Sequence, residues 1–199
     1  MEKTALKKRK KQGIIKREIS ILRLFDHPNI CKYYKLLEDN SKVYIILELC
    51  GPMTLSKYCR RHPEKRLSEE KAFMVFKQIV QGLKHIHHKG YCHKDLKLTN
   101  ILIDTSRTVK LIDFGFSGRA DILINEFCGT PSYVPPELVM GKAHFGKPVD
   151  VWAIGVVLYK LLTNEYPFGT ESDKMLKKNI LGVKFTFPEY VSESSREFI

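Results

Sequence analysis

The chain has 199 residues, of which 43% are hydrophobic, so it can bury a substantial core as one domain or as one domain with a partial second. Its formal net charge of +12 favours acidic partners, such as nucleic acid, acidic protein segments or anionic lipid. No apolar run approaches the roughly 20 residues that a membrane-spanning helix needs, and no signal-peptide stretch follows the basic N-terminus. We therefore expect a globular protein of the cytoplasm or nucleus that does not enter a membrane.

The basic residues are densest at residues 7–11 (KKRKK), which form either a nuclear-import or nucleic-acid patch or a solvated segment. No aromatic residues interleave this run, so we expect no specific nucleic-acid binding. The five cysteines are scattered, odd in number and without a C-x-x-C pair. They predict free thiols and no structural metal site.

In the N-terminal part, apolar residues at helical spacing predict a helix from Ile14 to Phe25, which residues 27–29 (HPN) end. Two strand-like runs follow, at residues 30–37 and 43–49, with a polar turn between them. The Gly-Pro pair at residues 51–52 then breaks the chain.

Further along, a long amphipathic helix is predicted between Ser68 as N-cap and Gly90 as stop. Residues 101–103 and 109–112 predict a short hairpin.

The last part of the chain begins with an irregular segment at residues 114–136, and loops of that length are usually functional or disordered. Residues 149–162 are apolar nearly all round, which predicts a buried helix. Another helix is predicted at residues 172–180, and the chain ends as one more begins.

Two segments carry groups suited to phosphoryl transfer: residues 93–100 (HKDLKLTN) and residues 113–115 (DFG). Transfer from ATP needs one carboxylate at the attacking hydroxyl and further oxygen ligands that hold Mg²⁺ against the phosphates. Asp95, Asn100 and Asp113 have side chains of these types.

Together with residues 128–137 (CGTPSYVPPE) and 150–155 (DVWAIG), these segments resemble the eukaryotic serine/threonine protein kinase family. The sequence looks closest to the calcium/calmodulin- and AMP-activated-like group, with polo-like kinases as a near alternative. The resemblance implies an α+β, bilobal protein-kinase-like fold. Residues 1–50 would form an incomplete small β-rich lobe with the first helix, two or three strands and the hinge. Residues 51–199 would form a mainly helical large lobe that lacks its last helices.

By this resemblance, Asp95 would orient the substrate hydroxyl and accept its proton, and Lys97 would neutralise charge on the transferred phosphate. A lysine at this position is typical of serine/threonine kinases rather than tyrosine kinases. Asn100 and Asp113 would bind Mg²⁺.

The resemblance also implies a set of ATP-binding residues. Lys7 would be the ATP lysine or else one more member of the basic run, since it precedes Glu18 by only eleven residues. Glu18 would pair with that lysine or be a surface residue. Leu47 would be the gatekeeper, and the backbones of Glu48 and Cys50 would pair with adenine. The implied set is Lys7, Glu18, Leu47, Glu48, Cys50 and Leu102.

The chain departs from the family pattern at both ends. No glycine-rich phosphate loop precedes Lys7, and the arginine that normally pairs with the glutamate equivalent to Glu137 is missing. We expect either a fragment truncated at both ends or a reduced kinase that works without its lid. Loss of the lid predicts weak ATP affinity and slow turnover.

A further departure lies in the activation segment, where relatives carry a phosphorylatable threonine and an arginine that binds its phosphate. Glu126 and Lys94 occupy these positions. Either Glu126 imitates the phosphate and Lys94 contacts it, or Glu126 is an unrelated surface residue.

The leading hypothesis is therefore a serine/threonine protein kinase that uses ATP and Mg²⁺. The alternative is a weak or inactive pseudokinase that acts as a protein-binding scaffold. The expected partners are proteins with Ser/Thr acceptors and a regulatory protein. Thr54 and Thr99 stand where kinases that prefer basic substrates often have glutamates, which argues against that preference.

Overall fold

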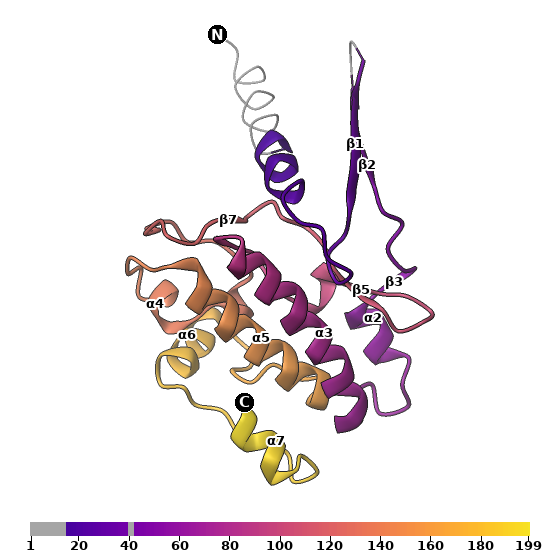
Figure 1. Cartoon of the computed structure of the whole chain (residues 1–199). Helices are drawn as coiled ribbons and strands as arrows, with labels where there is room; N and C mark the ends of the chain where they lie inside the picture. The colour runs from indigo at the N-terminus through magenta and orange to yellow at the C-terminus, as the bar shows by residue number, and fades with distance from the viewer. Residues whose placement is uncertain (1–14, 40–41) are drawn as a thin grey trace.

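The computed structural model describes residues 15–39 and 42–199 (Figure 1). A small part, made of the helix at residues 15–22 and the hairpin of β1 (Tyr33–Glu38) and β2 (Val43–Leu47), rises from a larger and mainly helical body. This combination of helices and short strands confirms the predicted α+β class.

The two predicted strands pair antiparallel, with Glu38 opposite Val43 and an irregularity near Tyr33. The first strand begins later than predicted because Ile30 makes a parallel bridge to Leu111 in the body instead. The first helix also ends before Phe25, at residue 22, because the chain must turn ahead of Pro28.

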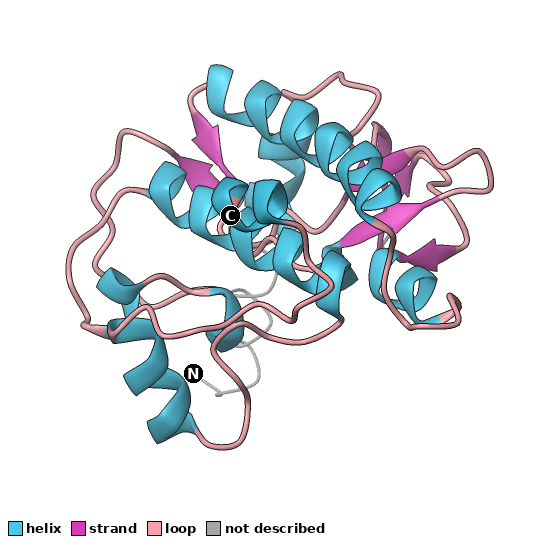
Figure 2. Cartoon of the chain, turned by 90° about the horizontal axis from the view of Figure 1, so that it is seen from below, coloured by secondary structure: helices cyan, strands magenta, loops and turns pink. Residues whose placement is uncertain are grey.

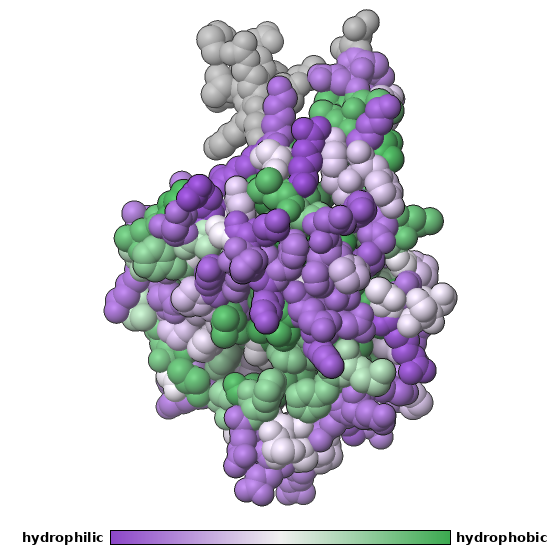
Figure 3. Space-filling model, in the orientation of Figure 1, coloured by the Kyte–Doolittle hydropathy of each residue, from purple (hydrophilic) through white to green (hydrophobic). Residues whose placement is uncertain are grey.

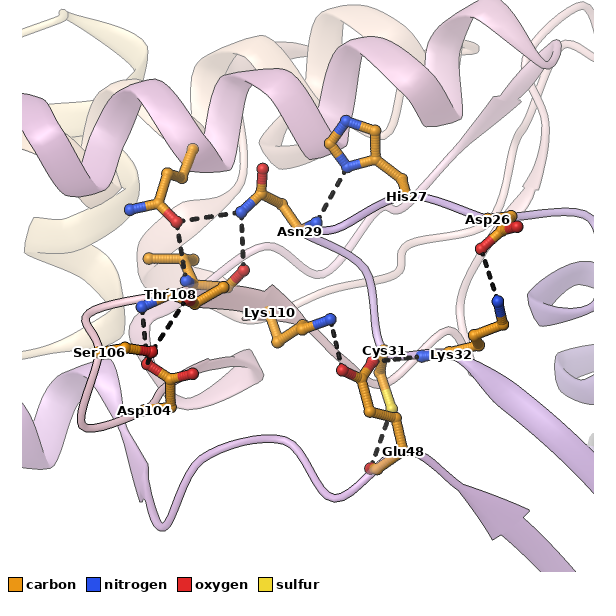
Figure 4. A network of polar contacts seen from close by, with 12 residues as sticks. Asp26, His27, Asn29, Cys31, Lys32, Glu48, Asp104, Ser106, Thr108 and Lys110 are labelled. Carbon is orange, nitrogen blue, oxygen red and sulfur yellow. Dashed lines mark hydrogen bonds and ion pairs between the residues drawn. The ribbon is translucent and has the colours of Figure 1, made fainter.

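The segment that enters β1 is tied to the body by polar contacts (Figure 4). Asn29 Nδ2 donates to the Val109 carbonyl at 3.0 Å, and the Asn29 carbonyl accepts from the Leu111 amide at 2.9 Å. The Cys31 amide donates to the Leu111 carbonyl at 3.0 Å. These contacts extend the adjoining sheet and fix the point from which β1 rises.

The body is organised around α3 (Glu69–His88) and α5 (Gly146–Thr163), which pack against each other. Ser68 caps α3 by accepting from the Lys71 amide, and Gly90 follows the helix with a φ of 80°, so both predicted end signals are confirmed. The predicted buried helix is confirmed as α5, most of whose residues are buried.

Short strands lie at the margins of the helical body, as Figure 2 shows. β5 (Ile101–Ile103) and β6 (Val109–Leu111) form the predicted hairpin, and β3 (Met53–Thr54) adds to it as a third strand. β4 (Tyr91–Cys92) pairs with β7 (Gly118–Arg119). Neither β3, β4 nor β7 is predicted, because two-residue strands carry no period.

The remaining helices are short. α2 (Leu55–Arg60) follows β3 and is capped by Thr54, and it is absent from the prediction. α4 (Pro136–Val139) follows the 3₁₀ turn η2 (Pro131–Tyr133) within the long irregular segment and at its end.

The chain closes with two predicted helices. They are α6 (Asp173–Leu181), capped by Ser172, and α7 (Glu193–Phe198), capped by Ser192.

The main apolar core joins the small part to the body, because Ile21, Leu22 and Phe25 belong to the same buried cluster as α3 and α5. The expected division into two lobes at residue 50 therefore stays a prediction. No helix among residues 15–39 and 42–199 is long and apolar enough to cross a membrane.

The hairpin above the body exposes apolar side chains, which are green at the upper right of Figure 3. Successive residues of a strand point to opposite sides, so Tyr44 and Val43, both exposed, show that both faces of the hairpin reach solvent. The exposed apolar residues of the hairpin are Tyr34, Leu37, Val43, Tyr44, Ile46 and Leu47.

Candidate active site

The carboxylate of Asp95 lies at the centre of a hydrogen-bonded array between β4 and β5. Asp95 is only 5% exposed. Its Oδ2 accepts from Lys97 Nζ at 2.7 Å and from Asn100 Nδ2 at 3.0 Å, and its Oδ1 accepts from Thr130 Oγ1 at 2.8 Å. Lys97 Nζ also donates to Thr130 Oγ1 at 2.8 Å. The structure thus brings together both predicted catalytic residues and one predicted metal ligand.

Asp150 on α5 holds the backbone that carries this array. It is fully buried, and a buried charge is stable only when hydrogen bonds replace its hydration. Its Oδ1 accepts from the Lys94 amide at 2.7 Å, and its Oδ2 accepts from the His93 amide at 2.9 Å. A third contact, at 2.8 Å, joins Oδ2 to His87 Nε2. Lys94 is thereby held in the left-handed region, with a φ of 68°.

His93 is a second buried support of the loop. Its Nδ1 accepts from the Asp95 amide at 3.3 Å, and its Nε2 lies 3.1 Å from the Ile112 carbonyl, which can only accept. These partners place the ring proton on Nε2. The ring therefore links the catalytic loop to the residue just before Asp113.

The irregular segment reaches the catalytic loop at Gly129 and Thr130. Gly129 has a φ of 96°, and a Cβ there would lie 2.8 Å from the Lys94 carbonyl oxygen, so a side chain would both strain the backbone and clash. This close approach brings the Thr130 hydroxyl to Asp95 and Lys97.

Asn100 and Asp113 are brought to the same end of the β5–β6 hairpin by its register, which places Ile101 opposite Leu111. The Ile112 amide also donates to the Asn100 carbonyl at 3.0 Å. Because Asn100 Nδ2 donates to Asp95, its amide oxygen is left as an acceptor, and no other described residue hydrogen-bonds to it.

A cavity of about 310 Å³ opens beside this end of the hairpin. It is lined by every described member of the predicted ATP-binding set: Glu18, Leu47, Glu48, Cys50 and Leu102. Asp113 lines it as well. Lys7, the remaining member, lies outside the described residues.

The charge of this cavity suits a cation. Burial, and then the neighbouring carboxylate of Asp113, raise the pKa of Glu18, while a hydrogen bond from the Phe114 backbone opposes that rise. Two carboxylates that face one cavity are stabilised by a divalent ion, and the Asn100 amide oxygen is a further hard ligand. The residues present therefore fit Mg²⁺, with phosphate oxygens and water completing its shell.

The wall formed by Glu48 is fixed by two lysines (Figure 4). Its carboxylate contacts Lys110 Nζ at 2.6 Å and accepts from the Lys32 amide at 3.0 Å. Burial opposes ionisation of Glu48, but these contacts outweigh it and lower the pKa. The Glu48 carbonyl accepts from the Cys50 amide at 2.9 Å, so the two backbones predicted to pair with adenine contact each other.

Two thiols also line this cavity. A hydrogen bond between Cys31 and Cys50 lowers the pKa of Cys31 and raises that of Cys50. All five cysteines are free, as predicted.

Sequence reasoning did not identify Thr130 and Asp150 as functional residues. Both lie in segments that resemble the kinase family, but their contacts join residues far apart in the sequence. Asp150 had one local signal, since it is the acidic residue in a helix that is otherwise nearly all apolar.

The proposed contact between Glu126 and Lys94 is wrong. No ion pair joins these two described residues, and Glu126 is exposed. Lys94 instead extends towards β7, where a Cβ added to Gly118 would lie 3.4 Å from Lys94 Nζ and 3.0 Å from Arg17 Nη2. The positive φ of Lys94, imposed by Asp150, directs its side chain away from Glu126.

The whole chain, residues 1–199, matches the protein kinase domain family. The chain belongs to this family. The arrangement of Asp95, Lys97, Asn100 and Asp113 is thus found in a kinase domain by descent as well as by geometry.

Relatives of this kinase domain have Ser/Thr kinase names. It is 36% identical over 204 residues to maternal embryonic leucine zipper kinase of Xenopus laevis, covering 98% of this chain and 31% of the relative. It is 38% identical over 193 residues to serine/threonine-protein kinase kin-29 of Caenorhabditis briggsae, covering 95% and 24%. It is 39% identical over 186 residues to serine/threonine protein kinase OSK3 of Oryza sativa subsp. indica, covering 92% and 36%.

The kinase domain therefore spans between 24% and 36% of the length of these three relatives. The predicted resemblance to serine/threonine protein kinases is confirmed.

Proposed function

We propose that this chain catalyses transfer of the γ-phosphate of ATP to serine or threonine hydroxyls of proteins. The observation that carries the proposal is the array around Asp95, in which Lys97, Asn100 and Thr130 all donate to one nearly buried carboxylate. A carboxylate has about four lone-pair sites, so these three bonds leave room for the substrate hydroxyl.

Each residue has a defined task in this reaction. Asp95 orients the substrate hydroxyl and accepts its proton as the oxygen attacks phosphorus. Lys97, held between Asp95 and Thr130, places its positive charge where negative charge develops on the transferred group. Asn100 and Asp113 hold Mg²⁺, which when bound neutralises the phosphates.

Glu18, Leu47, Glu48, Cys50 and Leu102 form the walls of the proposed ATP cavity. Adenine pairing by Cys50 requires its amide to leave the Glu48 carbonyl, so part of the binding energy is spent on opening this turn. We further propose protein substrates, a regulatory protein partner, and a cytoplasmic or nuclear location.

The test is phosphate transfer from labelled ATP with Mg²⁺ to a generic Ser/Thr protein, comparing the chain with Asp95→Asn. Loss of the base is expected to lower the rate by about 10²–10⁴-fold. Asp121→Asn is the matched control, because Asp121 is exposed and pairs only with Arg119. Equal transfer by Asp95→Asn, or no transfer by folded wild-type chain, would favour the scaffold alternative.

A further inference from the structure

A second cavity, of about 470 Å³, lies on the other side of the catalytic lysine from the nucleotide. Lys97 and Thr130, which hold Asp95, form part of its lining. The cavity therefore borders the place where a substrate hydroxyl would meet Asp95, and it is distinct from the cavity that Glu18 and Asp113 line.

The lining of this cavity is cationic. Arg60 at the end of α2, Lys97 in the catalytic loop and Lys160 on α5 all contribute to it, and no aspartate or glutamate does. Lys97 is paired with Asp95. Within residues 15–39 and 42–199, no carboxylate lies within 4.0 Å of the charged nitrogens of Arg60 or Lys160.

Lys160 is the most informative of the three cations because it is only 8% exposed. Its Nζ lies 3.4 Å from the centre of the Tyr166 ring and 3.4 Å from the carbonyl oxygen of Asn164, and both residues line the same cavity. The ammonium is thus held at the cavity wall by a ring face and one long hydrogen bond.

This placement is costly for the folded chain. Burial lowers the pKa of Lys160 to about 8, although the charges of Cys59 and Glu165 oppose the change. A lysine in an apolar helix would be expected to reach solvent or to find an anion. An unpaired ammonium beside the catalytic residues is a feature that a bound anion would stabilise.

We propose that this cavity binds an anionic side chain of the protein substrate, a carboxylate or a phosphate monoester, close in sequence to the acceptor serine or threonine. Lys160 and Arg60 would contact the anion directly. Ser56 and Thr99, which also line the cavity, add hydroxyl donors. The inference rests on the proposed kinase function and names the class of substrate that this site selects.

Arg60 and Lys160 differ in exposure, and this adds a salt dependence to the expectation. Arg60 is exposed, so salt weakens its attraction for the anion, whereas the buried Lys160 is screened much less. The preference for an anion is therefore expected to fall in part, but not to vanish, between low and physiological ionic strength.

The test uses synthetic peptides with one serine acceptor in a neutral background and one varied residue at each position from four before to four after it. The varied residue is phosphoserine, aspartate, asparagine or lysine, so that the two anion sources are compared. At one position or more, kcat/KM for phosphoserine or aspartate is expected to exceed that for asparagine by about ten- to a hundredfold. Lysine there is expected to be worse than asparagine.

Substitutions locate the effect. Lys160→Met and Arg60→Gln are each expected to lower the ratio of anionic to asparagine peptide by about tenfold. The exposed residues Lys84 and Arg61 do not line the cavity, so Lys84→Met and Arg61→Gln are matched controls that keep the ratio. Because Arg60 is exposed on α2, its variant tests the proposal even if Lys160→Met alters packing.

Binding of fluorescein-labelled peptides, measured by anisotropy, separates this proposal from the proposed function. Tighter binding of the phosphoserine peptide that Arg60→Gln weakens, in a chain without Asp95-dependent transfer, would support the cavity and overturn the kinase activity. Asp95-dependent transfer with no preference for anions, or with a preference for lysine, would overturn the cavity proposal and leave the activity standing. A preference unchanged in both Arg60→Gln and Lys160→Met would also overturn it.

Discussion

The catalytic loop and the nucleotide cavity lie next to each other but are held in very different ways. The loop is fixed by buried side chains of the body, since Asp150 binds its backbone and Thr130 binds its carboxylate. The cavity is assembled from the helix at residues 15–22, the exposed hairpin and the segment after β2. The comparison teaches that this fold preorganises the proton-transfer groups, while the ATP site depends on elements with little apolar cover.

The largest effect is expected at Asp150, because its removal leaves the buried amides of His93 and Lys94 without an acceptor. Asp150→Ala should destabilise the fold by about 3–5 kcal/mol, measured by urea unfolding. Asp121→Ala, at an exposed ion pair, should cost less than about 1 kcal/mol. Similar losses for both variants would show that the loop is not held as described.

Thr130→Val is expected to act on the reaction rather than on stability. It removes the hydroxyl that joins Lys97 to Asp95 but keeps the volume, so kcat should fall about ten- to a hundredfold while KM for ATP changes little. Thr130→Ser should restore most of the rate. A rise in KM with kcat unchanged would place Thr130 in binding instead.

Lys160 is the exception to the good pairing of the catalytic side, and its removal should stabilise the free chain. Because burial lowers its pKa to about 8, the folded chain releases the proton more readily than the unfolded one, and stability rises with pH between about 8 and the ordinary lysine pKa. Allowing for its contact with the cavity, Lys160→Met should add roughly 1–2 kcal/mol at pH 7 and nothing above about pH 10.5. Urea unfolding at both pH values checks this, and a variant less stable at pH 7 would contradict it.

The smallest effect is expected on the nucleotide side, at Glu18. Burial and the charge of Asp113 raise its pKa, so its ionised form costs stability at neutral pH. Glu18→Gln should therefore be slightly more stable than wild type at pH 7, and the gain should shrink as pH falls to the range where glutamate is protonated in both states. Glu38→Gln, on an exposed residue, serves as control. A gain that grew at low pH would be the opposite of this expectation.

The elements predicted from the sequence are those whose signals are local. α3 has a repeated apolar face and a serine cap, and α5 is apolar on every side, so each could be identified without knowledge of its neighbours. The two-residue strands β4 and β7 could not, because they exist only through pairing between residues distant in the sequence.

The candidate site was predictable to the same extent. The segments that carry Asp95, Asn100 and Asp113 are short and specific, and the structure brings Asp95 and Asn100 into contact. Contacts that join separate elements were not predictable. Thr130 reaches Asp95 from the irregular segment, and Lys160 was an unremarked member of an apolar helix until the fold placed it beside Tyr166.

The most direct test of the account measures ATP binding and phosphate transfer on the same pair of proteins, wild type and Asp95→Asn. The account predicts that both bind ATP with similar, Mg²⁺-dependent affinity by titration calorimetry, because Asp95 does not line the nucleotide cavity. It also predicts that only the wild type transfers phosphate to a serine or threonine at a measurable rate. Transfer by Asp95→Asn at the wild-type rate would contradict the assignment of Asp95 as the base on which the proposed function rests.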